Sequence, residues 1–360
     1  MYQPAAIMQT KIFATVPEAM HWKGDVTQWF AAPSRDQWGR TGSLPGSFLE
    51  SPNFDRAGIL HCVDIPYGRI LRVNASGQFE VVYQYDGEPN ALRFHRDGRI
   101  FIADAKRGIL LLDPTNWKLE PFVTRANYEG LRGPNDLVFA PNGDLYFTDP
   151  GQSDLINPTG RVVHVRPDGQ AKIILDRIPG PNGLVLNDSG TMLYLAVTRT
   201  NSVWQLNLRS DATVSKAGVF VQMSGGMGPD GLTMDSKGNL LVAHAGGACV
   251  WVFDPYGEPL YRLKSCAGRV MTNLTYSPAD PHMLYMTEAT SGSKSVAKKA
   301  DTMNAELSAT SAYSKLDQKQ VTSWLDLRNK AAHGKYTEYS KAQVVLMHQG
   351  ILEFMTRVHS

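Results

Sequence analysis

A polar residue recurs along this chain at nearly constant spacing, and each copy begins a short apolar segment that ends in a turn. Successive copies are 40 to 48 residues apart, and the six are Glu50, Asn90, Asn135, Asn182, Asp230 and Asn273. A repeat of about 45 residues is typical of β-propellers, in which every repeat forms a four-stranded antiparallel blade. The spacing therefore predicts an all-β fold, a six-bladed β-propeller.

The third repeat, PNDLVFAPNGDLYFTDP, shows the strand pattern most clearly. Its Asn142-Gly143 pair lies between two apolar segments, which is a strong signal for a β-hairpin. Further alternating segments follow in most repeats and supply a third and a fourth strand. The sixth repeat lacks a good third strand, so we expect a strand near residues 11–16 to close the ring as the outer strand of the last blade.

The composition is that of a soluble globular protein, with 360 residues, 42% hydrophobic and 19% charged. The net charge of +2 gives no reason to expect nucleic acid or a membrane as a partner. The three cysteines form no CxxC pair, and no apolar run approaches the ~18 residues of a membrane helix. The N-terminus has no apolar core typical of a secretory signal, so we expect a cytoplasmic protein.

The pattern changes after Pro281, the last proline of the chain, and becomes helical from Lys294 onward. We therefore predict two domains, a propeller over residues 1–293 and a helical tail over residues 294–360. The tail residues Arg328, Asn329 and His333 weakly resemble the motif of HEPN-type ribonuclease domains, although a solvated helix end capped by Gly334 is the simpler interpretation. The apolar helical face over residues 344–358 favours packing on the propeller or self-association.

The innermost strand of a blade begins at the same end of the central channel at which the second strand ends. This end should collect the six repeated polar residues together with a second set at the ends of the second strands, namely Asp64, Asp104, Asp149 and His244. Carboxylate and amide oxygens suit Ca²⁺ or Mg²⁺ better than structural zinc. The alternative for each of these residues is that it caps a turn or hydrates the channel.

Four segments resemble the gluconolactonase family, which includes regucalcin (senescence marker protein): FLESPNFDRAG, GPNDLVFAPNGDLYFTDP, GPNGLVLNDSGTMLYLAV and GPDGLTMDSKGNLLVAHAG. The resemblance implies a six-bladed propeller that holds one divalent cation on its axis, with Glu50, Asn182 and Asp230 as ligands. It also implies that Asn135 lines the site. The chain departs from the family where Ser51 follows Glu50, since the family often has Gly there, and where Gly133 replaces an Arg that some members carry.

The function that the resemblance implies is metal-dependent hydrolysis of a lactone, a sugar lactone or a similar cyclic ester. Ca²⁺ is the expected ion, with Mg²⁺, Mn²⁺ or Zn²⁺ as alternatives. Asp230 is the candidate general base and His244 the alternative base, while the residues expected to bind a small-molecule lactone are Asn135, Asn90, His244 and Asp149.

Two other functions remain open from the residues alone. A phosphotriesterase-type hydrolase would use the same metal site, and a non-catalytic metal-binding propeller would use the ring only as a platform. The GxSxG motif of serine hydrolases is absent, and no GxGxxG motif opens the strand-to-helix unit on which dinucleotide binding depends.

Overall fold

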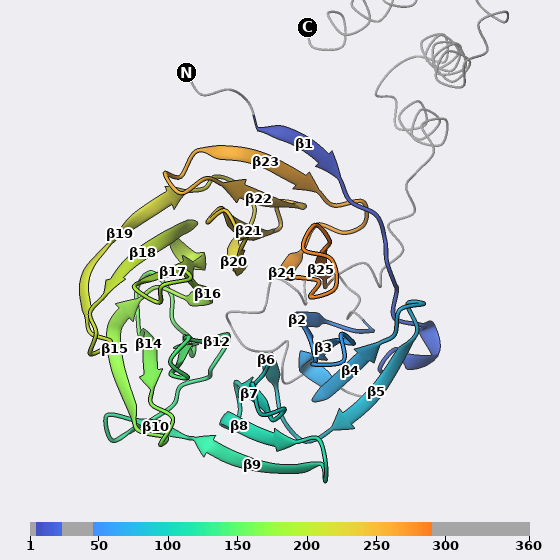
Figure 1. Cartoon of the computed structure of the whole chain (residues 1–360), viewed down its shortest axis with the longest axis horizontal. Coiled ribbons are helices and arrows are strands. Elements are labelled where there is room, and N and C mark those ends of the chain that lie inside the picture. The colour runs from blue at the N-terminus through green and yellow to red at the C-terminus, as the bar shows by residue number, and fades with distance from the viewer. Residues whose placement is uncertain (1–4, 24–45, 290–360) are drawn as a thin grey trace, which may run out of the picture. The chain divides into compact units, whose positions relative to one another are not determined.

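The computed structural model describes residues 5–23 and 46–289, which consist almost entirely of strands and turns. The chain divides into two units, Met1–Ser293 and Lys294–Ser360. The described residues all belong to the first unit, where successive sheets are arranged around a common axis (Figure 1). The helices predicted after residue 293 lie outside the described residues, so the nature of the tail stays a prediction.

Five blades each contain four antiparallel strands that follow one another in chain order, and the sheet of blade five has one further strand at its outer edge. The strands are β2 (Leu49–Phe54), β3 (Leu60–Asp64), β4 (Arg69–Val73) and β5 (Phe79–Gln84) in blade one, β6 (Pro89–Phe94), β7 (Ile100–Asp104), β8 (Gly108–Asp113) and β9 (Lys118–Val123) in blade two, β12 (Leu137–Phe139), β13 (Leu145–Asp149), β14 (Gly160–Val165) and β15 (Ala171–Ile178) in blade three, β16 (Pro181–Leu186), β17 (Met192–Val197), β18 (Ser202–Leu208) and β19 (Val214–Gln222) in blade four, and β20 (Gly228–Met234), β21 (Leu240–Ala245), β22 (Cys249–Phe253) and β23 (Pro259–Lys264) in blade five.

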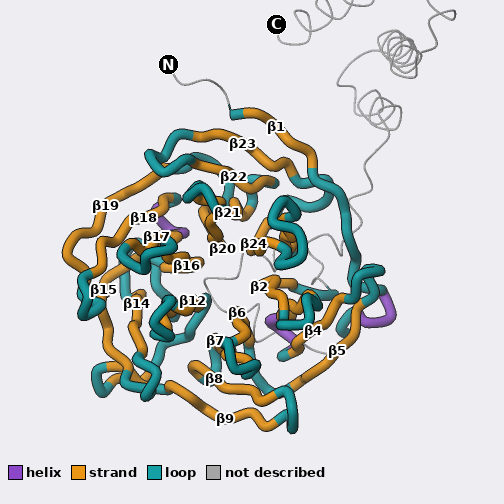
Figure 2. Tube along the Cα trace, viewed as in Figure 1, coloured by secondary structure: helices purple, strands orange, loops and turns teal. Residues whose placement is uncertain are grey.

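The sixth position of the ring is filled by a smaller sheet, in which β24 (Met271–Tyr276) pairs only with β25 (Leu284–Glu288) among the described residues. The ring nevertheless closes, because β24 lies against both β20 and β2. The Thr272 hydroxyl also donates a hydrogen bond to the Leu49 carbonyl oxygen at 2.9 Å. The prediction of six complete blades is therefore wrong for the described residues, which form five blades and a two-stranded sixth unit (Figure 2).

The prediction of a closing strand near residues 11–16 is also wrong. The first strand is β1 (Ala6–Gln9), and it pairs in parallel with β23, so that it adds a fifth strand to blade five instead of completing the sixth unit. An outermost strand needs a neighbour with free backbone groups, and β23 presents such an edge. The two-stranded sixth unit offers no third strand, among the described residues, on which a fourth could pair.

The minor elements lie in the connections between strands. They are η1 (Glu18–Met20), η3 (Ile65–Tyr67), η4 (Thr198–Thr200) and the short hairpin of β10 (Arg125–Ala126) with β11 (Glu129–Gly130). Within residues 5–23 and 46–289, no helix has the length and hydropathy that a bilayer crossing requires.

The hydrophobic core is divided among the interfaces between adjacent blades. Four of five apolar clusters join residues of two neighbouring sheets. The fifth contains Ile70 of blade one and Leu92 of blade two, and it also includes Ala245 of blade five. The polar residues Glu50, Asn90 and Asp230 of the inner strands belong to none of these clusters. Polar side chains can therefore face the channel there.

Candidate functional site

Bulges at the starts of the inner strands shape the site. In β2, β6, β16, β20 and β24, one extra residue is inserted opposite the second strand at the position of the repeated polar residue, as between Glu50 and Asn53 or between Pro229 and Leu232. A bulge bends a strand and redirects a side chain. The repeated polar residues consequently turn away from the regular alternation of the sheet.

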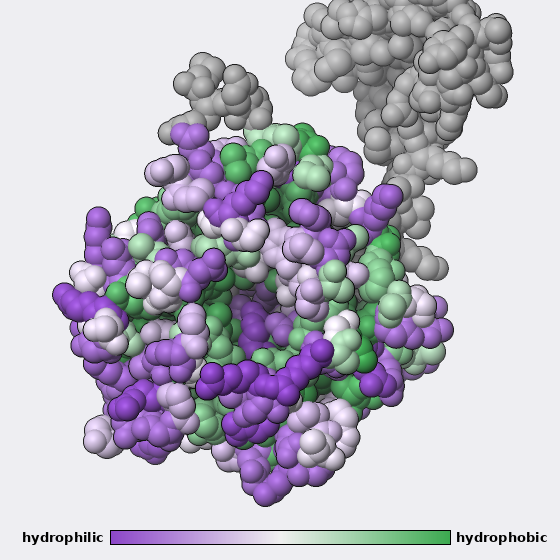
Figure 3. All heavy atoms as spheres, viewed as in Figure 1, coloured by the Kyte–Doolittle hydropathy of each residue, from purple (hydrophilic) through white to green (hydrophobic). Residues whose placement is uncertain are grey.

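Three carboxylates interact electrostatically at the centre of the ring, although they come from three different blades. Burial raises the pKa of Glu50 well above its ordinary value, and repulsion from Asp230 and Asp136 raises it further. Burial is also the main cause that raises the pKa of Asp136. Seen along the axis, the propeller is hollowed at its centre and the surface inside is hydrophilic (Figure 3).

Asp230 is the carboxylate of this group that keeps part of its surface open to solvent. Burial and the charge of Asp136 raise its pKa to about 8, while a hydrogen bond from Asn182 lowers it. A carboxyl group with such a pKa is protonated over much of the neutral range unless a cation stabilises its ionised form. Glu50 and Asn182 thus both interact with Asp230, Glu50 through repulsion between carboxylates and Asn182 through a hydrogen bond.

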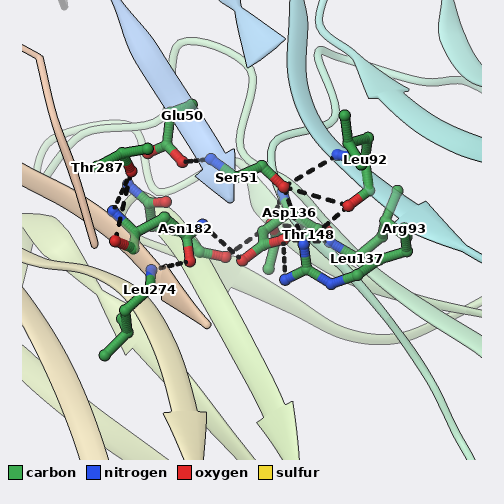
Figure 4. A network of polar contacts seen from close by, with 11 residues as sticks. Glu50, Ser51, Leu92, Arg93, Asp136, Leu137, Thr148, Asn182, Leu274 and Thr287 are labelled. Atoms are coloured by element: carbon green, nitrogen blue, oxygen red, sulfur yellow. Dashed lines mark hydrogen bonds and ion pairs between the residues drawn. The ribbon is translucent and has the colours of Figure 1, made fainter. Parts of the chain in front are cut away.

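A second layer of contacts surrounds Glu50 and Asp136 (Figure 4). The backbone N–H of Ser51 donates to Glu50 Oε2 at 2.6 Å, and the guanidinium of Arg93 forms an ion pair with Asp136 Oδ1 at 3.2 Å. Asn273 Nδ2 is 3.4 Å from the other oxygen of Asp136. Three carboxylates and one guanidinium leave a formal charge of −2 when all are ionised, which matches one divalent cation.

Small residues allow the inner strands to approach the axis. Gly231 directly follows Asp230, and a β-carbon at position 231 would lie 2.2 Å from the side chain of Asn273. This distance is far below van der Waals contact, so the close approach of β20 and β24 depends on glycine at this position.

The second set of acidic residues has a structural role in this geometry. Asp149 is fully buried; its Oδ1 accepts hydrogen bonds from the backbone N–H groups of Arg132 and Gly133, both at 2.8 Å, and its Oδ2 accepts one from Arg161 Nε at 3.0 Å. Asp64 and Asp104 similarly accept backbone hydrogen bonds from the segments that lead into their blades. Both oxygens of Asp149 are engaged, and this geometry gives no support to substrate binding by Asp149.

His244 and Asn90 form hydrogen bonds with groups other than the three carboxylates. Trp251 Nε1 donates to His244 Nδ1 at 3.3 Å and His244 Nε2 faces the Gly225 carbonyl oxygen at 3.0 Å, so both ring nitrogens have partners. Burial lowers the pKa of His244, as expected for a neutral ring. The Asn90 amide donates to the Pro134 carbonyl oxygen at 3.3 Å and joins blade two to blade three.

Asn135 is placed differently, because its side chain is partly exposed and forms no hydrogen bond with the rest of residues 5–23 and 46–289. Its backbone N–H is held by the Thr148 carbonyl oxygen at 3.0 Å. The amide of Asn135 therefore remains available to a ligand next to Asp136.

Asp136 and Arg93 lie at the site but were not singled out from the sequence, and Ser51 was noted there only as a departure from the family pattern. A signal for Asp136 exists in the repeats, since the residue after the repeated polar position is uncharged in the other five: Ser51, Ala91, Gly183, Gly231 and Leu274. Nothing in the sequence pattern distinguishes Arg93 from other arginines on strands.

The side-chain oxygen atoms of the three candidate ligands are chemically suited to a divalent cation. Glu50, Asp230 and Asn182 offer two carboxylates and one amide, all oxygen donors suited to Ca²⁺ or Mg²⁺. The raised pKa values of Glu50 and Asp230 reflect buried negative charge that a cation would compensate. No group of three or more His, Cys, Asp or Glu side chains arranged around a metal position occurs in the part of the chain that the structure describes.

Comparison with solved structures shows the same fold. The propeller is similar to a gluconolactonase of Xanthomonas campestris, with a TM-score of 0.61 and 24% identity over 68% of this chain and 84% of that one. It is also similar to regucalcin of Agrobacterium tumefaciens strain C58, described as a calcium-binding protein, with a TM-score of 0.61 and 24% identity over 70% and 86% of the two chains.

Comparison with curated proteins gives relatives of higher identity. Lactonase drp35 of Staphylococcus epidermidis is 33% identical over 228 residues, which cover 60% of this chain and 69% of that protein. The gluconolactonase of Zymomonas mobilis is 32% identical over 209 residues, or 52% and 57% of the two chains. The family model "SMP-30/Gluconolactonase/LRE-like region" matches residues 48–290. With more than half of its length matched, the chain belongs to the SMP-30/gluconolactonase/LRE-like family.

Proposed function

We propose that this protein is a lactonase that depends on one divalent cation held by Glu50, Asn182 and Asp230. The observation that carries the proposal is the convergence of buried carboxylates from separate blades with a single guanidinium to offset them. The names of the relatives, a lactonase and a gluconolactonase, support the choice of a lactone as substrate. Ca²⁺ is the preferred candidate, because oxygen donors surround the position and the similar regucalcin is described as calcium-binding.

The residues have distinct parts in the proposed reaction. A bound cation would supply a Lewis acid that polarises the ester carbonyl. Asn135, whose amide is available, would orient the lactone ring. Asp230 would accept a proton from the attacking water; its carboxyl group then returns the proton to the ring oxygen as the acyl C–O bond breaks, and the product is a hydroxy acid.

A substrate panel tests the proposal. The purified chain is assayed with γ- and δ-lactones and with paraoxon, before and after treatment with EDTA and with divalent ions added back. Turnover of lactones that is lost with EDTA and restored by an ion is the expected result. Turnover of paraoxon alone would indicate a phosphotriesterase, and cation binding without turnover would indicate a binding propeller; either result overturns the proposal.

A further inference from the structure

Ser51 adopts a backbone conformation that L-residues rarely use. Its φ is +49°, in the left-handed region that favours glycine, and it lies in the bulge of β2 directly after Glu50. A non-glycine residue stays in this region only where surrounding contacts compensate the cost. Ser51 is also fully buried, so its hydroxyl group must find partners within the protein.

The Ser51 hydroxyl uses its full hydrogen-bonding capacity, one donor and two acceptor positions. It donates to the Leu92 carbonyl oxygen at 3.2 Å, accepts from the Leu92 backbone N–H at 3.0 Å, and accepts from Arg93 Nη1 at 2.8 Å. These hydrogen bonds connect the bulge of blade one to β6 of blade two. In the same conformation, the Ser51 N–H points at Glu50 Oε2, at a distance of 2.6 Å.

Arg93 extends this connection to a third blade. Its Nη1 atom also donates to the Leu92 carbonyl oxygen at 2.9 Å, while Nη2 reaches Asp136 Oδ1 at 3.2 Å. Figure 4 shows the guanidinium next to both Ser51 and Asp136. The planar fork of an arginine can serve two partners in fixed directions, whereas the ammonium of a lysine acts as a point charge.

We propose that Arg93 is a positioning residue for the cation site, which acts through Ser51 to fix the carboxylate of Glu50 and at the same time holds Asp136 beside it. This inference rests on the proposed cation site and concerns residues that touch neither the cation nor the substrate. Groups that orient ligands in this way typically change metal affinity about 10- to 100-fold when they are replaced.

The test is the affinity of the metal-free chain for Ca²⁺, measured by isothermal titration calorimetry in Arg93→Lys. This variant keeps the positive charge next to Asp136 but removes the fork that joins it to Ser51. We expect Ca²⁺ binding to weaken at least about tenfold, together with a lower kcat for the lactone. The matched control is Arg72→Lys, since Arg72 forms an exposed ion pair with Glu80 on the outer part of blade one; its Ca²⁺ affinity should equal that of the unaltered chain.

A second variant tests the same positioning role in case Arg93→Lys does not fold. Ser51→Ala keeps the β-carbon but removes the hydroxyl group that contacts Arg93. It should weaken Ca²⁺ binding to a similar degree. Circular dichroism and thermal unfolding show which variants are folded. Unchanged Ca²⁺ affinity in either folded variant overturns the positioning role. Failure of the unaltered chain to bind any divalent ion would instead reject the proposed function itself.

Discussion

Gly183 and Asp230 meet across the boundary between blades four and five, where a β-carbon at position 183 would lie 2.3 Å from the Asp230 carbonyl oxygen. No carbon atom can take that place without moving the backbone, so β16 and β20 run this close only because position 183 lacks a side chain. The contact brings Asn182, which precedes Gly183, next to the Asp230 carboxylate. The relative position of two proposed cation ligands, Asn182 and Asp230, therefore depends on one glycine.

Replacing Gly183 with alanine should separate β16 from β20. We expect the free energy of unfolding to fall by about 1–3 kcal/mol, as for other overpacked sites, and the affinity for a divalent cation to fall as well. Chemical denaturation and calorimetry measure the two effects. Gly218→Ala is the control, because a β-carbon at position 218 on β19 meets no atom within 4 Å. Equal stability and cation affinity in the two variants would show that the contact is unimportant.

Asp230→Asn should abolish most of the lactone turnover while the fold is retained. The substitution keeps the size of the side chain but removes the proton acceptor and one anionic donor, so we expect kcat to fall by at least about 10²-fold. Steady-state kinetics give the change, and circular dichroism checks the fold. Asp188→Asn, at an exposed turn of blade four, provides the comparison. If Asp230→Asn turned over lactone as fast as Asp188→Asn, the role given to Asp230 would be rejected.

The stability of the metal-free protein should depend on the ionisation of Asp230. The pKa of this group is raised from 3.8 to about 8 in the folded chain, so the folded state binds a proton that the unfolded state releases. The resulting stabilisation is complete below about pH 4 and is lost as the pH rises toward and through about 8. Thermal unfolding between pH 5 and 8.5 should therefore show the unaltered chain losing stability relative to Asp230→Asn.

Added Ca²⁺ should reverse this trend, because the ion favours the ionised carboxylate and its binding releases protons. The expected stabilisation is about 2.7 kcal/mol at a free ion concentration 100 times the dissociation constant. A metal-free chain whose stability relative to Asp230→Asn rises over the same pH range would contradict the raised pKa.

The variant Asp149→Asn should show whether Asp149 stabilises the fold or binds the substrate. The change weakens the pairing of the buried Arg161 guanidinium, and loss of one partner of a buried ion pair costs about 3–5 kcal/mol. We expect a large loss of stability with an unchanged KM for the lactone at a temperature where the variant is folded. A raised KM without a loss of stability would instead support substrate binding by Asp149.

The sequence by itself was sufficient for the parts of the protein that repeat. The spacing of Glu50, Asn182 and Asp230 predicted that residues distant along the chain meet at one axis, and the segments around them identified the family. Such patterns are visible in a sequence because each repeat forms the same local hairpins, and the Asn-Gly and similar turns are encoded within a few residues. The all-β propeller followed from the same information.

Tertiary structure alone decided the features that depend on contacts between blades. Asp136 and Arg93 joined the site through contacts between blades, since Arg93 reaches both Asp136 Oδ1 and the Ser51 hydroxyl group, and such contacts leave no trace in the spacing of the repeats. The pairing of β1 with β23 and the two-stranded sixth unit likewise depend on which strand edges are free in the assembled ring. Local sequence specifies a strand, but its partner is chosen by the backbone groups that remain unpaired around it.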